Sequence, residues 1–223
     1  MNRYETWFCG TRLWRWVTRR QVLPWMLQGS ELGDHVLELG AGPGAATEEL
    51  GRLASRVTSL ECDHAFAAKL GARINGSNAA AIQGDAAALP FADGTFSSAI
   101  AILMLHHLRS NELQDRAFAE AWRVLRPGGV FLAFEIQDGW LHRLGHIRST
   151  FVPVAPATAF ARLTAAGFSK VTVDIQRGAI ESGRCVRGRT EHRHAGDGTV
   201  TCCLLPAGQA RSASASRGGW NRA

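Results

Sequence analysis

The chain has few of the residues that mark several common enzyme and membrane-protein classes. Its 223 residues include one tyrosine, Tyr4, and two lysines, Lys69 and Lys170. A short-chain dehydrogenase needs a Tyr-x-x-x-Lys pair, and the chain has none, so that class of nicotinamide enzyme is excluded. The longest strongly apolar run, residues 99–105, is far shorter than the roughly 20 residues that span a bilayer.

Cysteine usage is also sparse and irregular. The five cysteines are an odd number, they form no Cys-x-x-Cys motif, and they have no metal-ligand spacing with the eight histidines. We therefore expect neither a disulfide framework nor a metal site. The first 30 residues lack the unbroken apolar core and the small-residue cleavage site of a secretion signal. Together these features predict a cytoplasmic location.

The net charge of +6 is concentrated in one part of the chain. Residues 184–223 hold seven Lys and Arg against two Asp and Glu, which leaves 18 against 17 in residues 1–183. The near-neutral body gives no electrostatic reason to expect a specific nucleic-acid partner. Only the basic carboxyl-terminal segment gives weak support to an RNA-modifying alternative.

Strand-like and helix-like patterns alternate from residue 36 to about residue 177. This order predicts an α/β protein with a doubly wound, mostly parallel Rossmann-like sheet and helices on both faces. We divide the chain into an aromatic and basic helical cap at residues 1–30, the α/β domain at residues 31–205, and a disordered basic tail at residues 206–223.

The first 30 residues combine aromatic and basic side chains. Four of the seven tryptophans lie here, with arginines between them: Trp7, Trp14, Trp16 and Trp25. Three interpretations stay open. The segment is a lid that lends aromatic walls to an acceptor pocket, a helix packed on the sheet, or a helix that makes a peripheral membrane contact.

Three glycines at alternate positions, Gly40, Gly42 and Gly44, follow a short apolar run and precede a helical pattern. Glycine permits positive φ and lets a ligand approach bare backbone, while the following helix presents unpaired N–H groups. The pattern predicts a nucleotide-type pocket. Residues 40–45 also satisfy the looser dinucleotide fingerprint, so a nicotinamide-dependent oxidoreductase and a purely structural turn remain alternatives.

Two acidic residues follow later predicted strands. Glu61 ends a strand about 20 residues after the glycines, where a carboxylate can hold both hydroxyls of a ribose; its alternative is a surface acid. Asp85 follows the strand predicted at residues 80–83 and can accept a hydrogen bond from the exocyclic amine of adenine.

Five ordered motifs together resemble the class I S-adenosylmethionine-dependent methyltransferases, and most of all the small-molecule branch related to the quinone-biosynthesis enzymes. The motifs are Leu-Glu-Leu-Gly-Ala-Gly-Pro-Gly at 37–44, the acid at 61, Gly-Asp-Ala-Ala-Ala-Leu-Pro-Phe at 84–91, His-His-Leu at 106–108 and Val-Leu-Arg-Pro-Gly-Gly at 124–129. The resemblance implies that S-adenosyl-L-methionine is the cofactor and that residues 31–205 are the methyltransferase domain.

The resemblance also implies roles for single residues. Those assigned to the cofactor are Gly40, Gly42 and Gly44 under its methionine part, Glu38 at its amino group, Glu61 at the ribose, and Asp85 with Ala86 at the adenine.

The family has a seven-stranded sheet completed by an antiparallel hairpin. Here the last strand is doubtful, because residues 199–205 are the only good strand candidate beyond residue 182; either they form the seventh strand or the sheet lacks one.

Methyl transfer depends mainly on alignment of the reacting atoms, and a base helps when the acceptor is a hydroxyl, phenol or acidic carbon. We favour His106 as that base. It is expected with His107 at the end of the strand predicted at residues 96–105, where alternation turns one of them toward the acceptor; in the alternative both merely end the strand. Glu135, His142 and His146 are further candidates for the wall of the acceptor pocket. The predicted function is methyl transfer to an O, N or C atom of a small hydrophobic acceptor, and the alternative is a cofactor-binding protein without turnover.

Overall fold

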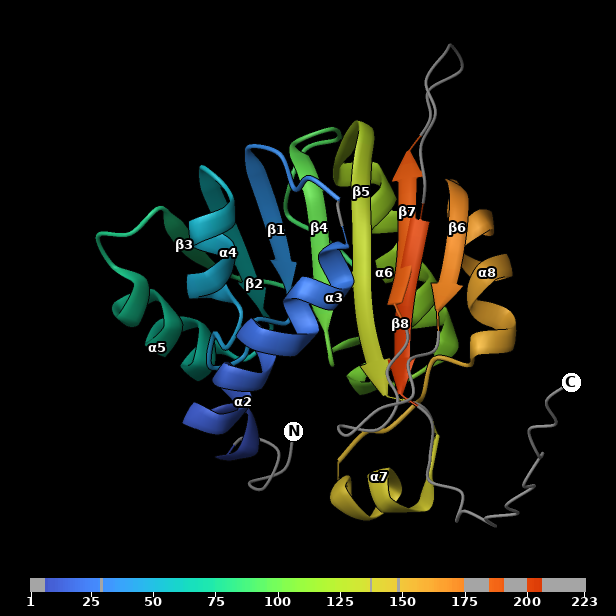
Figure 1. Ribbon diagram of the computed structural model, residues 1–223, viewed down its shortest axis with the longest axis horizontal. Coiled ribbons are helices and arrows are strands. Elements are labelled where there is room, and N and C mark those ends of the chain that lie inside the picture. Colours follow the sequence, from blue (N-terminus) through green and yellow to red (C-terminus); the bar gives the residue numbers. More distant parts are fainter. Residues whose placement is uncertain are drawn as a thin grey trace, which may run out of the picture.

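The computed structural model describes residues 7–28, 30–136, 138–147, 149–174, 185–190 and 200–205 (Figure 1). In these residues one eight-stranded sheet runs in the order β3-β2-β1-β4-β5-β7-β6-β8, with helices on both faces. The predicted α/β, mostly parallel fold is confirmed. The tail predicted to be disordered, residues 206–223, lies outside the described residues.

The helices and strands follow the alternation expected from the sequence. The strands are β1 (His35–Leu39), β2 (Arg56–Glu61), β3 (Ala79–Gln83), β4 (Phe96–Ile102), β5 (Leu125–Ile136), β6 (Phe168–Asp174), β7 (Cys185–Thr190) and β8 (Val200–Leu205). The helices are α2 (Arg12–Val17), the π-helical turn η1 (Thr18–Val22), α3 (Leu23–Leu27), α4 (Thr47–Leu53), α5 (His64–Ile74), the 3₁₀ turn η2 (Leu105–His107), α6 (Asn111–Val124), α7 (Trp140–Gly145) and α8 (Pro156–Ala165).

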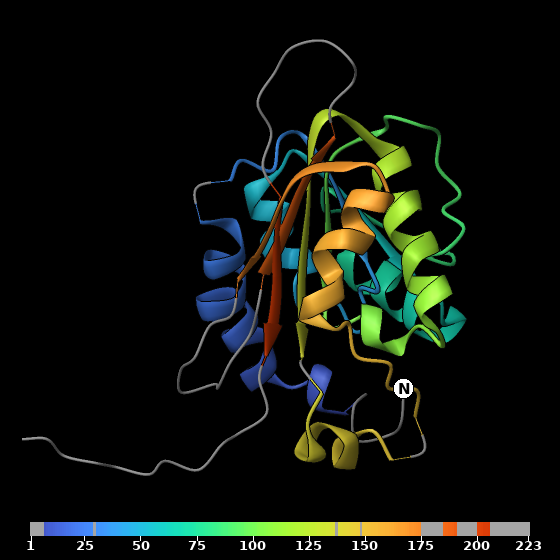
Figure 2. The same ribbon diagram turned by 90° about the vertical axis from the view of Figure 1, so that its right-hand side faces the viewer.

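The strands β1 to β5 pair in parallel, and β1 pairs with both β2 and β4. Alternate side chains of the central strands enter two apolar clusters. In β5, for example, Phe131 packs with Phe118 of α6 on one face, whereas Leu132 packs on the other face with the amino-terminal helices. Seen edge-on, the sheet separates these helices from α6 and α8 (Figure 2). Burial on both faces explains why the strands read as continuous apolar runs.

The end of the sheet differs from the expectation. Residues 200–205 form a strand, β8, but it pairs in parallel with β5 and β6. The antiparallel position beside β5 is taken by β7, which also pairs antiparallel with β6. The sequence Cys-Val-Arg-Gly-Arg-Thr of β7 lacks apolar alternation, so the prediction missed this strand.

Two helix starts follow from capping side chains. Asp63 accepts the N–H of Phe66 and starts α5. Ser110 accepts the N–H of Leu113, so α6 begins at Asn111. In the described part of the chain no helix is long and apolar enough to cross a membrane.

Candidate functional site

A cavity of about 360 Å³ opens at the carboxyl ends of β1, β2 and β4. Figure 1 shows that these strands point toward α2 and α7, which lie beyond this edge of the sheet. In doubly wound sheets ligands bind at this edge, and the volume falls in the usual range for small-molecule sites.

The glycine turn forms one wall of the cavity. Gly40 has φ +68°, and a Cβ atom there would lie 2.1 Å from Cγ of Met104. Gly42 has φ +51°, lines the cavity, and would place a Cβ in open space with no heavy atom within 4 Å. The first glycine is therefore required for packing, while the second leaves bare backbone facing the cavity.

Glu38 lies at the floor of the cavity and is 4% exposed. Its Oε2 accepts hydrogen bonds from Thr47 Oγ1 and Ser59 Oγ, each at 2.6 Å. Burial raises the pKa of Glu38, and the two hydroxyl donors partly oppose this rise. The family resemblance pointed to Glu38, but the sequence did not reveal that Thr47 of α4 and Ser59 of β2 orient it.

Glu61 is buried at the end of β2 and also lines the cavity. Its Oε2 accepts the Gly42 N–H at 2.8 Å, and its Oε1 accepts the Asp63 N–H at 2.9 Å. The carboxylate thus ties the glycine turn to β2, and it keeps unused acceptor positions because each carboxylate has about four. Its ribose contact stays a prediction.

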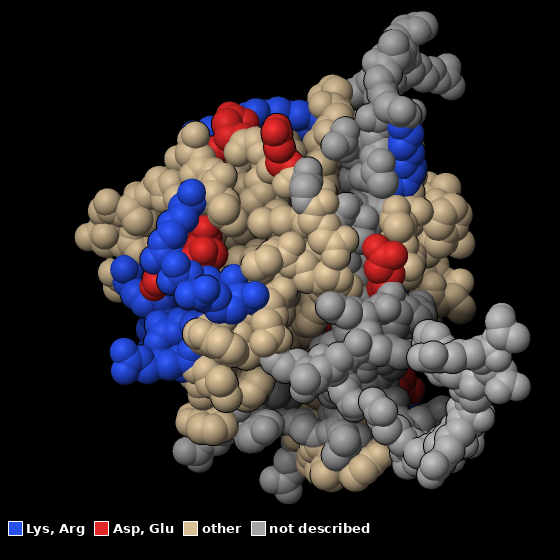
Figure 3. All heavy atoms as spheres, in the orientation of Figure 1, with Lys and Arg blue, Asp and Glu red and all other residues tan. Residues whose placement is uncertain are grey.

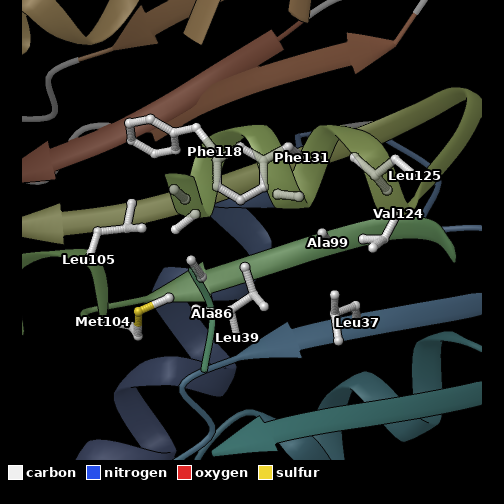
Figure 4. Packing of buried hydrophobic residues seen from close by; sticks show 14 of the residues in the cluster. Leu37, Leu39, Ala86, Ala99, Met104, Leu105, Phe118, Val124, Leu125 and Phe131 are labelled. Carbon is white, nitrogen blue, oxygen red and sulfur yellow. The ribbon is translucent and has the colours of Figure 1, made fainter. Parts of the chain in front are cut away.

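The remaining predicted cofactor residues do not line the cavity. Asp85 is exposed, and its Oδ1 accepts the N–H of Ala87 at 2.9 Å. Ala86 is buried beside Leu39 and Met104 in an apolar cluster (Figure 4). Gly44, at φ +74°, packs against α5. The cofactor roles assigned to these three residues stay predictions.

The amino-terminal segment packs on the sheet and also contributes to the cavity wall. Val17 and Met26 are buried against the sheet, while Trp14 and Thr18 line the cavity. A lid role stays a prediction. The hydroxyl of Thr18 is buried and has no hydrogen-bond partner among the described residues. Thr18 opens the π-helical turn η1, and such turns occur often at functional sites.

A second polar centre lies at the end of β5. Glu135 is fully buried, and its Oε1 accepts the backbone N–H groups of Met104 at 2.8 Å and Leu105 at 2.6 Å. Its Oε2 lies 2.5 Å from Nδ1 of His106. The carboxyl group therefore holds the turn after β4 and fixes the orientation of the His106 ring.

The expected placement of the two adjacent histidines is wrong. The strand β4 ends at Ile102, and His106 and His107 lie in η2, so strand alternation does not separate them. Their ring centroids are 4.2 Å apart, and that of His146 lies 5.1 Å from His106 and 5.5 Å from His107. His107 lines the cavity, whereas His106 is 2% exposed. The base role of His106 remains a prediction, and the side chain of His142 lies outside the described residues.

His107 sits among other imidazoles. Its Nδ1 lies 3.3 Å from the carbonyl oxygen of Thr150. Burial, together with the neighbouring His106 and His146, lowers the pKa of His107 to about 3. Its ring is therefore neutral at physiological pH, with one nitrogen available to accept a hydrogen bond or bind a cation.

Comparisons with known proteins identify the domain. Residues 37–133 match the family described as "Methyltransferase domain". The chain is 37% identical over 108 residues to a demethylmenaquinone methyltransferase of Thermobifida fusca, and 33% identical over 117 residues to a probable S-adenosylmethionine-dependent methyltransferase of Mycolicibacterium smegmatis. These matches cover 46% and 52% of this chain respectively, and 44% of each relative, so the chain spans less than half the length of these relatives.

The fold agrees with this match. A chain from the complex between the Haloferax volcanii Trm112 methyltransferase activator and a methyltransferase has a TM-score of 0.67 to this structure, at 18% identity. The likeness covers 86% of this chain and 99% of that one. The predicted likeness to S-adenosylmethionine-dependent methyltransferases, quinone-biosynthesis enzymes among them, is confirmed by the matches that include residues 37–133. Residues 37–133 therefore match a methyltransferase domain, and over this region the chain is similar to S-adenosylmethionine-dependent methyltransferases.

Proposed function

We propose that this protein transfers a methyl group from S-adenosyl-L-methionine to an oxygen, nitrogen or carbon atom of a small hydrophobic acceptor. The observation that carries the proposal is the cavity at the carboxyl edge of the sheet. One wall is the open backbone at Gly42, and two buried carboxyl groups, Glu38 and Glu61, line it. A cationic, hydroxyl-bearing ligand suits such a lining.

The residues present fit the cofactor in three respects. Glu38 offers its Oε1, which has no protein partner among the described residues, to an amino group. Glu61 has spare acceptor positions for ribose hydroxyls. The unpartnered hydroxyl of Thr18 offers a further polar contact in the wall. Gly40 and Gly44 shape the same turn, while Asp85 with Ala86 is proposed for the adenine by resemblance alone.

The bound cofactor supplies a methyl group on a sulfonium, which is already a good leaving group, so the protein chiefly has to align the acceptor. Where the acceptor carries a proton, His106 is the proposed base. Glu135 accepts from its Nδ1, which leaves Nε2 with a lone pair to take the proton. The positive charge then formed on the imidazole lies next to the Glu135 carboxylate, which stabilises it.

Transfer of a labelled methyl group tests the proposal. Purified protein is incubated with S-adenosylmethionine carrying a labelled methyl group and with panels of lipophilic quinone-like, phenolic and lipid acceptors. We expect label in an acceptor and a matching amount of S-adenosylhomocysteine. Tight cofactor binding with no transfer to any class of acceptor would instead favour the alternative, a cofactor-binding protein without turnover.

We also propose a cytoplasmic location with peripheral membrane contact. Large apolar side chains are exposed on two helices beyond the carboxyl edge of the sheet: Leu13 (64%) and Trp16 (53%) on α2, and Trp140 (69%) and Leu144 (57%) on α7. Figure 3 shows Lys and Arg side chains gathered on the side where α2 lies, among them exposed arginines of residues 12–20. Basic residues beside exposed tryptophans favour an anionic bilayer surface.

Vesicle sedimentation tests this contact. We expect the protein to bind vesicles that contain anionic phospholipid, and the double variant Trp16→Ala, Trp140→Ala to bind several-fold more weakly. Phe160→Ala is the matched control, because Phe160 is a large apolar side chain that is 55% exposed on a third helix, α8. Equal binding of the double variant and the control variant would contradict the proposed contact.

A further inference from the structure

Three histidines from two separate segments of the chain converge at the rim of the cavity. His106 and His107 come from η2, and His146 follows α7. One ligand nitrogen of each lies within 4.8 Å of the others. No spacing rule finds this group, because His146 is distant in sequence and no cysteine accompanies it.

His106 and His107 each have the partner that a metal-bound histidine usually has. Nδ1 of His106 lies 2.5 Å from the buried Glu135 carboxylate, and Nδ1 of His107 lies 3.3 Å from the carbonyl oxygen of Thr150. An acceptor at Nδ1 fixes the tautomer that leaves Nε2 as the ligand atom, and a carboxylate there raises the basicity of the ring.

We propose that His106, His107 and His146 form a binding site for a divalent transition-metal ion of the Zn²⁺ type. Imidazole is a preferred ligand of zinc, copper, iron and nickel. Zinc takes nitrogen ligands at about 2.0–2.1 Å, which places them about 3.3 Å apart in a tetrahedral site. Ligand nitrogens that lie within 4.8 Å of one another must therefore approach by no more than about 1.5 Å, which is within the reach of side-chain rotation.

The position of the site suggests an open coordination position. His107 and Thr150 both line the cavity, so an ion held by the three rings would lie at its rim. A fourth position open to the cavity would match zinc sites that bind a substrate or water. The ion would use Nε2 of His106, the same atom that the proposed base uses. The two roles therefore exclude each other at any one time.

Metal binding to the chelator-treated full chain tests the proposal, without methyl donor or acceptor, so that the outcome does not depend on the proposed function. Zn²⁺ is titrated by calorimetry, and Co²⁺ is titrated by visible absorption, which reports the ligand set. We expect one tight site per chain, weakened at least 100-fold in His146→Gln and in His107→Gln. Glu135→Gln should weaken it 10- to 100-fold by removing the acceptor at Nδ1.

His64→Gln is the matched control, because His64 is exposed and bonds Gln83 away from the cluster. We expect it to bind metal as the unaltered protein does. The far-ultraviolet spectrum of every variant is recorded, so that loss of binding is read only from folded protein. The proposal would be overturned if the folded unaltered protein bound neither Zn²⁺ nor Co²⁺. It would also be overturned if His146→Gln and His64→Gln bound the metal with equal affinity.

Discussion

Glu38 and Glu135 are buried carboxyl groups near the carboxyl ends of β1 and β5, two strands of the same sheet. They differ in how many of their oxygens accept hydrogen bonds from the protein. Oε2 of Glu38 accepts from two side-chain hydroxyls, those of Thr47 and Ser59, and its Oε1 is left toward the cavity. Both oxygens of Glu135 are used, by two backbone N–H groups and by His106. The first carboxyl group therefore keeps an acceptor oxygen that no described residue uses, whereas the second supports a neighbouring side chain.

The largest expected effects should separate the side of the site that holds Glu38 and Glu61 from the side that holds Glu135 and His106. We expect His106→Ala to lower the turnover rate by roughly 10²- to 10⁴-fold, the usual contribution of a general base, and to leave cofactor affinity unchanged. Glu61→Ala should weaken cofactor binding by about 10- to 100-fold, because a charged hydrogen-bond acceptor is lost. Steady-state kinetics and S-adenosylhomocysteine titration measure the two quantities. Equal loss of affinity in both variants would contradict the separation of roles.

Removal of the Glu135 carboxyl group should lower the free energy of unfolding more than removal of the Glu38 carboxyl group. Glu135→Ala leaves two buried N–H groups at the end of β4 without an acceptor, so we expect the free energy of unfolding to fall by roughly 2–5 kcal/mol. Glu38→Ala should cost only about 1 kcal/mol, since Ser59 Oγ already lies 3.4 Å from Thr47 Oγ1 and the hydroxyls can pair. Urea unfolding measures both. A larger loss in Glu38→Ala would reverse the comparison.

The side of the site that holds Glu38 could be predicted from the sequence, because local patterns determine it. A strand, three alternate glycines and a helix lie within about 20 residues, and the acid at Glu61 follows at the spacing the fold requires. The turn that places Gly42 on the cavity is set by backbone conformation, which glycine spacing reveals.

The side that holds Glu135 could not be predicted, because distant contacts determine it. The apolar run at residues 96–105 reads as one strand, yet β4 ends at Ile102 because Glu135 takes the next free N–H groups and bends the chain into η2. Periodicity does not detect an acceptor about 30 residues away. The approach of His146 depends in the same way on tertiary packing.

A glycine pair offers a smaller test of the ligand-facing side. Gly42 and Gly76 both have positive φ and open space where a Cβ would lie, but only Gly42 lines the cavity. Alanine should destabilise the fold by about 1 kcal/mol at each position. We expect only Gly42→Ala to weaken S-adenosylhomocysteine binding, by roughly tenfold, as measured by calorimetry. Equal affinities in the two variants would show that the Gly42 backbone does not face the ligand.

The smallest expected effect is a dependence of stability on pH. Burial raises the pKa of Glu38 above its ordinary value of 4.5. The folded pKa exceeds the unfolded one, so this contribution to stability is fully present below pH 4.5 and is lost as the pH rises through the folded value. Glu38→Gln removes the titration, and its stability relative to the unaltered protein should rise with pH from pH 4.5 upward. Urea unfolding at pH 4, 6 and 8 measures the difference, and a constant difference would contradict it.

Thermal unfolding with S-adenosylhomocysteine tests the cofactor site most directly, with NAD as the comparison ligand. A ligand at 100 times its dissociation constant stabilises the folded protein by about 2.7 kcal/mol, which in a chain of this size raises the melting temperature by roughly 5–11 °C. We expect that rise with S-adenosylhomocysteine, no rise with NAD, and a reduced rise in Glu61→Ala. Two results from folded protein would contradict the proposed function. One is a melting temperature that does not change with S-adenosylhomocysteine, and the other is a melting temperature that rises equally with NAD.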